Sequence, residues 1–350
     1  MTKKTTAARA CTLAALFLTS ASFAMPAAAD GEVNIYSYRQ PFLIEPLLDA
    51  FTKETGIKTN VIFADKGLGE RIQAEGANSP ADVLLTVDIG RLDGAKQMGI
   101  TQPVTSDAIE ANIPAEYRDP EGHWIGLTTR ARVIYASKDR VEQDTITYEE
   151  LADEKWRGRI CTRSGQHVYS IGLFASMVAH HGAEKTEEWL AAVRDNLASK
   201  PSGNDRAQVK SIYAGECDIS LGNTYYMGKM QTNEKEPEQK EWADSVKILF
   251  PNSQDRGTHV NIAGVVMAKH APHPDAAKKL IEFLTSEDAQ RIYADSNYEY
   301  PVKPGVPVSE RVASWGELTP DSLPLSEIAE NRKTASELVD KVGFNDGPSS

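Results

Sequence analysis

The chain has 350 residues, with 50 acidic and 38 basic side chains, and its formal net charge at pH 7 is −12. This length predicts one large or two medium domains. The acidic balance argues against partners such as nucleic acid or anionic lipid.

The N-terminus has the three parts of a secretory signal peptide. Its basic start is formed by Lys3, Lys4 and Arg9. An apolar stretch follows from about residue 11 to 25, and small residues end at Ala29. We predict that residues 1–29 are cleaved on export, which takes the net charge to −15 by removal of three basic residues. The alternative is a membrane anchor, but the apolar stretch is short for a membrane-spanning helix, and no later stretch predicts stable membrane insertion.

Strand and helix patterns alternate in the first part of the mature chain. Residues 32–38 are rich in β-branched and aromatic residues, which is typical of a strand. Pro41 then opens a helix with apolar residues at helical spacing, and Gly56 ends it. Further strands are expected at 58–63 and 81–87, and further helices at 70–77 and from 88 to 99. This order predicts a mostly parallel sheet covered by helices.

The second part continues in the same style. Extended segments are expected at 124–130, 133–136, 159–162, 217–221 and 260–267. Helices are expected at 148–156, 168–179, 187–197, 206–214, from Tyr225 onward, at 275–284 and at 289–294. We predict an α/β fold with one lobe at 31–126 and a second beginning near 130. The strand at 260–267 is expected to return to the first lobe, leaving a cleft between the two.

Two cysteines, Cys161 and Cys217, remain after the predicted cleavage. In an oxidising compartment they form one disulfide or stay as two free thiols, and we favour the disulfide because both begin predicted strands in the same half. No CxxC motif or zinc-type histidine spacing accompanies them, which argues against a cysteine-based metal site.

The usual enzyme motifs are absent from the sequence. It contains no GxSxG, Walker or HExxH motif and no convincing dinucleotide-binding glycine pattern. The histidines are scattered, and His180 and His181 lie before Gly182 at a predicted helix end, where positive charge is favoured. We therefore expect no enzymatic activity.

Two segments read as a strand, a small polar turn and a helix start. Residues 161–169 end at Tyr169, and residues 218–226 end at the adjacent Tyr225 and Tyr226. In open α/β sheets such turns lie at the carboxyl ends of strands, where ligands bind. Asn223 suits a helix N-cap, which places both adjacent tyrosines in the first helical turn.

Tyrosines at helix starts suit a hard, highly charged metal ion. Such ions prefer oxygen donors, and phenolate is a strong anionic donor. A free phenol has a pKa of about 10 and is neutral, but a helix N-terminus and a trivalent cation both favour the phenolate. The alternative is that these aromatic residues pack a core and a surface.

The order of several segments resembles that of the periplasmic ferric-iron-binding proteins of ABC iron uptake systems. These form a bacterial transferrin-like group of extracellular solute-binding proteins. The matching segments are 34–40, 74–88, 130–133, 164–169 and 223–226. The paired tyrosines and the Ala-Asp-Val-Leu-Leu-Thr-Val segment at 81–87 are the most discriminating. The resemblance covers nearly all of the mature chain.

The resemblance implies a type II periplasmic-binding-protein fold whose two lobes are hinged around a cleft. The implied N-terminal lobe is 30–128 plus about 260–302, and the C-terminal lobe is 129–259 plus about 303–350. The protein would be a periplasmic monomer that delivers Fe³⁺ to an ABC permease and its ATPase.

The resemblance also implies the site residues. Tyr169, Tyr225 and Tyr226 would be the phenolate ligands. Arg39 would hold a synergistic anion such as carbonate through paired hydrogen bonds, and Arg130 is a second candidate for the anion.

The first lobe departs from the family pattern. Members often carry a histidine or tyrosine just after the first strand, where this chain has Gln40 and Pro41. Some take a glutamate from the end of the third strand, where this chain has Val87 and then Asp88, which we expect to be a helix N-cap. We expect the first lobe to give no protein ligand, so that an anion or water completes the iron shell. Core or cleft-wall packing is expected for Tyr36 and Tyr38.

Two other functions stay open at this point. The same architecture binds small organic anions or polyamines in other proteins, although such ligands do not need paired phenolates. A secreted metal-dependent hydrolase would need a His/Asp cluster and a general base, which the sequence does not show.

Overall fold

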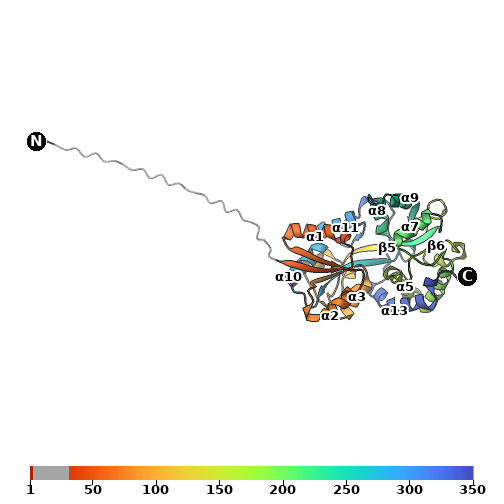
Figure 1. Ribbon diagram of the computed structural model, residues 1–350, viewed down its shortest axis with the longest axis horizontal. Coiled ribbons are helices and arrows are strands. Elements are labelled where there is room, and N and C mark those ends of the chain that lie inside the picture. Colours follow the sequence, from red (N-terminus) through yellow and green to blue (C-terminus); the bar gives the residue numbers. More distant parts are fainter. Residues whose placement is uncertain (3–30, 350) are drawn as a thin grey trace.

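The computed structural model describes residues 1, 2 and 31–349, so the predicted signal peptide lies outside the described residues except for its first two. Two lobes lie side by side, with long strands running between them (Figure 1). Within the described chain, no helix combines the length and the apolar character needed to cross a bilayer.

The first lobe is built on three parallel strands. Strand β1 (Glu32–Ser37) lies between β2 (Lys58–Phe63) and β3 (Val83–Thr86). The connections are α1 (Pro41–Thr55) and α2 (Leu68–Glu75), and α3 (Ile89–Gln97) follows β3. The predicted apolar stripe of α1 is buried, and Gly56 ends this helix in the left-handed conformation, with φ of 74°.

Two long strands join the lobes. Strand β5 (Ile125–Ser137) pairs through its first part with β9 (Val260–Ala268) and through its second part with β7 (Ile219–Asn223) and β8 (Val246–Leu249). Strand β9 also pairs with β3. The continuous order is β2-β1-β3-β9-β5-β7-β6. The α/β class is confirmed, but every pairing of β5 and β9 is antiparallel, so the sheet is mixed rather than mostly parallel.

The second lobe carries the two segments with tyrosines at helix starts. The short strand β6 (Ile160–Cys161) leads to α5 (Val168–His181) and α6 (Ala183–Asp195). Helix α7 (Asp205–Tyr213) leads to β7, which runs into α8 (Thr224–Gln231). The predicted disulfide between Cys161 and Cys217 is present, with a Cα–Cα distance of 5.8 Å.

The remaining elements cover the sheet and complete the chain. The helices are α4 (Asp107–Asn112), α9 (Glu238–Asp244), α10 (Pro274–Thr285), α11 (Glu287–Asn297), α12 (Glu310–Ala313) and α13 (Leu325–Lys341). The short strands are β4 (Thr101–Gln102) and β10 (Tyr300–Pro301), and the short 3₁₀ helices are η1 (Gly76–Asn78), η2 (Ala115–Tyr117) and η5 (Phe344–Asp346). Helix α13 packs on both α5 and α3 and so contacts both lobes. The exact lobe boundaries stay a prediction.

Two predicted extended segments are joined in the structure, and one predicted helix was wrong. The extended segments at 124–130 and 133–136 form the single strand β5. The helix expected at 148–156 is two 3₁₀ turns, η3 (Glu149–Ala152) and η4 (Glu154–Trp156), with an extended residue, Asp153, between them. The side chain of Asn196 donates to the carbonyls of Leu151 and Asp153, at 2.9 and 2.8 Å, and thereby replaces the helical hydrogen bonds.

Candidate metal centre

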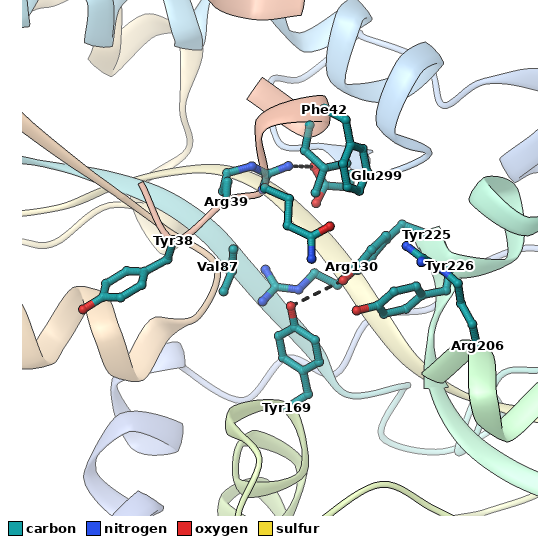
Figure 2. A pocket seen from close by; sticks show the side chains of 12 residues that line it. Tyr38, Arg39, Phe42, Val87, Arg130, Tyr169, Arg206, Tyr225, Tyr226 and Glu299 are labelled. Carbon is teal, nitrogen blue, oxygen red and sulfur yellow. Dashed lines mark hydrogen bonds and ion pairs between the residues drawn. The ribbon is translucent and has the colours of Figure 1, made fainter. Parts of the chain in front are cut away.

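A pocket lies where the two lobes face each other. Its walls come from the turn after β1 and the start of α1, the end of β3, the middle of β5, and the starts of α5, α7 and α8 (Figure 2). The lining residues are Tyr38, Arg39, Gln40, Phe42, Leu43, Val87, Arg130, Tyr169, Arg206, Tyr225, Tyr226 and Glu299. The pocket therefore contains all five residues that the sequence marked for metal or anion binding.

The three tyrosines meet in this pocket. The hydroxyl oxygens of Tyr169 and Tyr225 are 3.3 Å apart, and the rings of Tyr225 and Tyr226 stack with centroids 4.2 Å apart. Their hydroxyl groups point into the same part of the pocket (Figure 2). Three oxygen donors from two separate turns are thus placed close enough to share one ion.

The local sequence explains why the tyrosines lie at helix starts. Residue Tyr169 is the second residue of α5, and its backbone N–H donates to Nδ1 of the N-cap residue His167 at 3.2 Å. Residue Asn223 occupies the predicted N-cap position of α8. Its side chain makes no capping hydrogen bond, because Oδ1 instead accepts from Arg132 at 3.2 Å.

Burial keeps the paired phenols protonated in the metal-free protein. It raises the pKa of Tyr225 well above its usual value, with the nearby Tyr169 adding to the effect. Burial, followed by Tyr169 and Asp205, raises the pKa of Tyr226 to about 12. The sequence led us to expect that the helix N-terminus favours the phenolate, but desolvation outweighs it. A metal ion must therefore displace protons from these oxygens.

Arg130 brings an uncompensated positive charge to the pocket. It lies on β5 and is 2% exposed, and its guanidinium is 5.5 Å from the Tyr169 ring centre. Its Nη1 and Nη2 atoms are buried and have no hydrogen-bond partner among the described residues. Buried guanidinium groups are normally paired, so these two donors are suited to an anion in the pocket.

Arg39 has a protein partner that the sequence did not reveal. Its side chain is buried, and Nη2 lies 2.8 Å from Oε2 of Glu299. The hydroxyl of Thr128 donates to the same oxygen at 3.1 Å. Because Glu299 balances its charge, Arg39 has less capacity than Arg130 to compensate an added anion.

Arg206 was also missed by the sequence analysis. It lines the pocket and lies over the Tyr226 ring, 5.4 Å from its centre. No motif marks either Arg206 or Glu299, so only the fold reveals their place.

The first lobe brings two potential anionic ligands to the pocket wall, but Glu299 is paired with Arg39, and the Tyr38 hydroxyl points away from the three tyrosines and accepts from the Gly69 N–H at 3.0 Å (Figure 2). The first lobe also supplies Gln40 and Val87, with Phe42 and Leu43 nearby. Among residues 31–349, no group of three or more His, Cys, Asp or Glu side chains is placed to hold a metal ion. Oxygen donors from tyrosine are thus the main ligand set that the pocket offers.

Three other residues of the first lobe, Asp88, Tyr36 and Tyr38, were expected to have structural roles. Asp88 occupies the N-cap position of α3, but the Ile89 N–H donates to the side chain of Asn261 instead. The Asp88 carboxylate accepts from Asn261 at 2.8 Å and contacts Arg332 at 3.2 Å. The core and wall roles are filled by Tyr36, which is 1% exposed, and Tyr38, which lines the pocket.

Comparison with known proteins agrees with this geometry. Residues 78–318 match the family model described as bacterial extracellular solute-binding protein. Iron uptake protein A1 of Synechocystis sp. is 47% identical over 316 residues, which cover 89% of this chain and 87% of that protein.

Two solved structures extend the likeness to three dimensions. The apo ferric ion-binding protein A of Pasteurella haemolytica is 52% identical, with a TM-score of 0.86 and coverage of 90% of this chain and 98% of that one. A Trichodesmium protein solved in complex with iron and citrate ligands is 44% identical, with a TM-score of 0.84 and coverage of 90% and 100%. The predicted two-lobed periplasmic-binding-protein fold (type II) is confirmed.

Proposed function

This chain belongs to the bacterial extracellular solute-binding proteins, and we propose that it is the periplasmic component of an ABC iron uptake system, binding Fe³⁺ through Tyr169, Tyr225 and Tyr226. The observation that carries the proposal is the meeting of these three phenols in one pocket between the lobes. A trivalent ion bound to three phenolates has no net charge, so the ligand set matches Fe³⁺ better than a divalent cation.

The remaining charges of the pocket favour a bound anion beside the iron. Once three phenolates neutralise Fe³⁺ and Glu299 neutralises Arg39, the positive charges of Arg130 and Arg206 remain. A dianion such as carbonate would balance both. It would use the two unpartnered Nη atoms of Arg130 for paired hydrogen bonds, with Arg39 as a further donor. The citrate in the Trichodesmium structure supports an oxygen-rich anion of this kind.

The same family membership supports the proposed cellular role. Relatives are named as iron uptake and ferric iron-binding periplasmic proteins. The protein, exported through its signal peptide and acting as a monomer without catalysis, delivers iron to an inner-membrane permease driven by its ATPase. The other ligand classes are not favoured. A polyamine would meet the positive charges of Arg130 and Arg206, and a free organic anion needs no cluster of phenols.

The test is a titration of the mature protein with Fe³⁺ in bicarbonate buffer, followed by visible absorption. A phenolate-to-iron charge-transfer band, giving an orange-red colour, is expected. Replacing Tyr225 and Tyr226 by Phe should remove most of it. Tyr213→Phe is the matched control, because Tyr213 is 48% exposed at the end of α7, outside the pocket. A wild-type protein without the band, or an undiminished band in the double variant, would refute the ligand assignment.

A further inference from the structure

A single buried carboxylate connects the two turns that carry the tyrosines. Asp205 is the first residue of α7 and is 0% exposed. Its Oδ2 accepts from Nη1 of Arg132 at 2.7 Å and from the backbone N–H of Asn223 at 2.9 Å. Its Oδ1 accepts from Nη1 of Arg163 at 2.8 Å. Both oxygens therefore accept hydrogen bonds from named partners.

Two of these three partners, Asn223 and Arg163, lie next to a tyrosine of the pocket. Asn223 is the N-cap residue of α8, two positions before Tyr225, and its backbone is held by Asp205. Arg163 lies in the turn between β6 and α5, and its guanidinium is 5.3 Å from the Tyr169 ring centre. The carboxylate thus acts on both sides of the 3.3 Å contact between the hydroxyls of Tyr169 and Tyr225.

The carboxylate is held in its ionised form. Burial opposes ionisation, but Arg132 and Arg163 outweigh it and keep the pKa of Asp205 below its usual value. The N-terminus of α7 also favours a negative charge at this place. Neither oxygen is directed at the pocket, because Asp205 is not among the residues that line it.

We propose that Asp205 is a positioning residue of the metal centre: by bridging Arg163 and the Asn223 backbone, it sets the separation and direction of the Tyr169 and Tyr225 phenols. This inference rests on the proposed ferric-iron function. Asp205 acts through its partners and does not contact the ion. Partners that orient metal ligands typically contribute 10- to 100-fold in affinity.

The test compares Asp205→Asn with Asp218→Asn. Asp218 also bridges two arginines, Arg140 and Arg159, but it lies just before β7, at the end away from the tyrosines. Both substitutions remove one negative charge from an arginine-bridging carboxylate in the same lobe, so both should lower Tm. Only Asp205→Asn should also lower Fe³⁺ affinity, by about 10- to 100-fold, and shift the charge-transfer maximum.

A second variant keeps the test decisive if Asp205→Asn does not fold. Arg163→Met leaves Asp205 paired with Arg132 and the Asn223 backbone while cutting the connection to Tyr169. It should weaken affinity and shift the band. Wild-type affinity and an unshifted band in a folded Asp205→Asn or, failing that, in Arg163→Met would overturn the positioning role while leaving the ferric function intact. A wild-type protein without any band would overturn the proposed function and this inference together.

Discussion

Replacing Arg130 by methionine should change stability and iron binding in opposite directions. The two Nη atoms of Arg130 are buried without a hydrogen-bond partner in the described chain, so the metal-free protein carries an unsatisfied charge. Methionine is long and unbranched and fills the same space without that charge. The metal-free variant should therefore be more stable than the wild type, although it has lost a residue of the proposed site.

The size of the stability effect follows from the contacts. An unsatisfied buried donor costs about 1–3 kcal/mol, and more when charged. Against this, Arg130 lies over the Tyr169 ring, an interaction of about 0.5–1 kcal/mol. The net gain is roughly 1–2 kcal/mol, which corresponds to a rise in Tm of about 1.5–3 °C for a mature chain of about 320 residues. In bicarbonate, Fe³⁺ affinity should fall by about 10- to 100-fold because the anion loses its paired donors.

The assay is thermal unfolding of the metal-free protein together with Fe³⁺ titration in bicarbonate. Arg132→Met is the control, because Arg132 is equally buried on the same strand but its Nη1 pairs with Asp205 at 2.7 Å, whereas its Nε and Nη2 also lack partners in the described chain. Arg132→Met leaves the buried Asp205 carboxylate with one arginine, Arg163, instead of two, so this control should lose stability. If Arg130→Met lowers Tm as Arg132→Met does, the view of Arg130 as a poised, unpaired anion donor is wrong.

Three further predictions address protons, the disulfide and the contact between the lobes. Because burial raises the pKa of Tyr226 to about 12, Fe³⁺ binding must release its proton, so Fe³⁺ affinity should fall as pH falls, by up to about tenfold per pH unit for each phenolate. Chelator competition should show that the slope of log affinity against pH is one unit smaller in Tyr226→Phe than in the wild type. An equal slope in the two proteins would contradict proton displacement. Replacing Cys161 and Cys217 by Ala opens a loop of 56 residues and should lower the free energy of unfolding, measured in urea, by about 4 kcal/mol. A decrease below about 1 kcal/mol would show that the disulfide does not stabilise the fold in this way. A Cβ on Gly228 would lie 2.3 Å from the Tyr298 ring, so Gly228→Ala should destabilise the folded protein by about 1–3 kcal/mol. Adding Tyr298→Ala should remove most of that loss, whereas strictly additive losses in the double variant would show that the two residues do not clash.

Local patterns were enough to predict where the tyrosines lie. A strand, a polar turn and a helix start confine a residue to the carboxyl edge of a sheet, whatever the rest of the chain does. Tyr169 and Tyr225 therefore fall at helix starts as expected, and their 56-residue separation in sequence becomes a 3.3 Å contact. The apolar period of α1 likewise needs no long-range information.

The charged partners of the pocket could not be predicted, because they depend on contacts distant in sequence. Arg39 and Glu299 are 260 residues apart, and Arg132 and Asp205 are 73 apart. The division of β5 into two predicted segments has the same origin. Arg130 and Arg132 interrupt its apolar pattern, yet both are buried, one toward the pocket and one against Asp205. The break in the pattern was itself a sign of the site.

Burial of neutral phenols gives the pocket a basis for selecting its ion. Desolvation of the neutral phenols of Tyr225 and Tyr226 costs far less than desolvation of their phenolates, so the metal-free cleft tolerates them. An ion must supply enough electrostatic stabilisation to displace the protons, which a trivalent cation does better than a divalent one at the same distance. In the proposed site, three phenolates would neutralise the metal, and an anion would then balance Arg130 and Arg206. Metal, protons and anion are therefore linked, and acidification or withdrawal of the anion should each promote release of the iron.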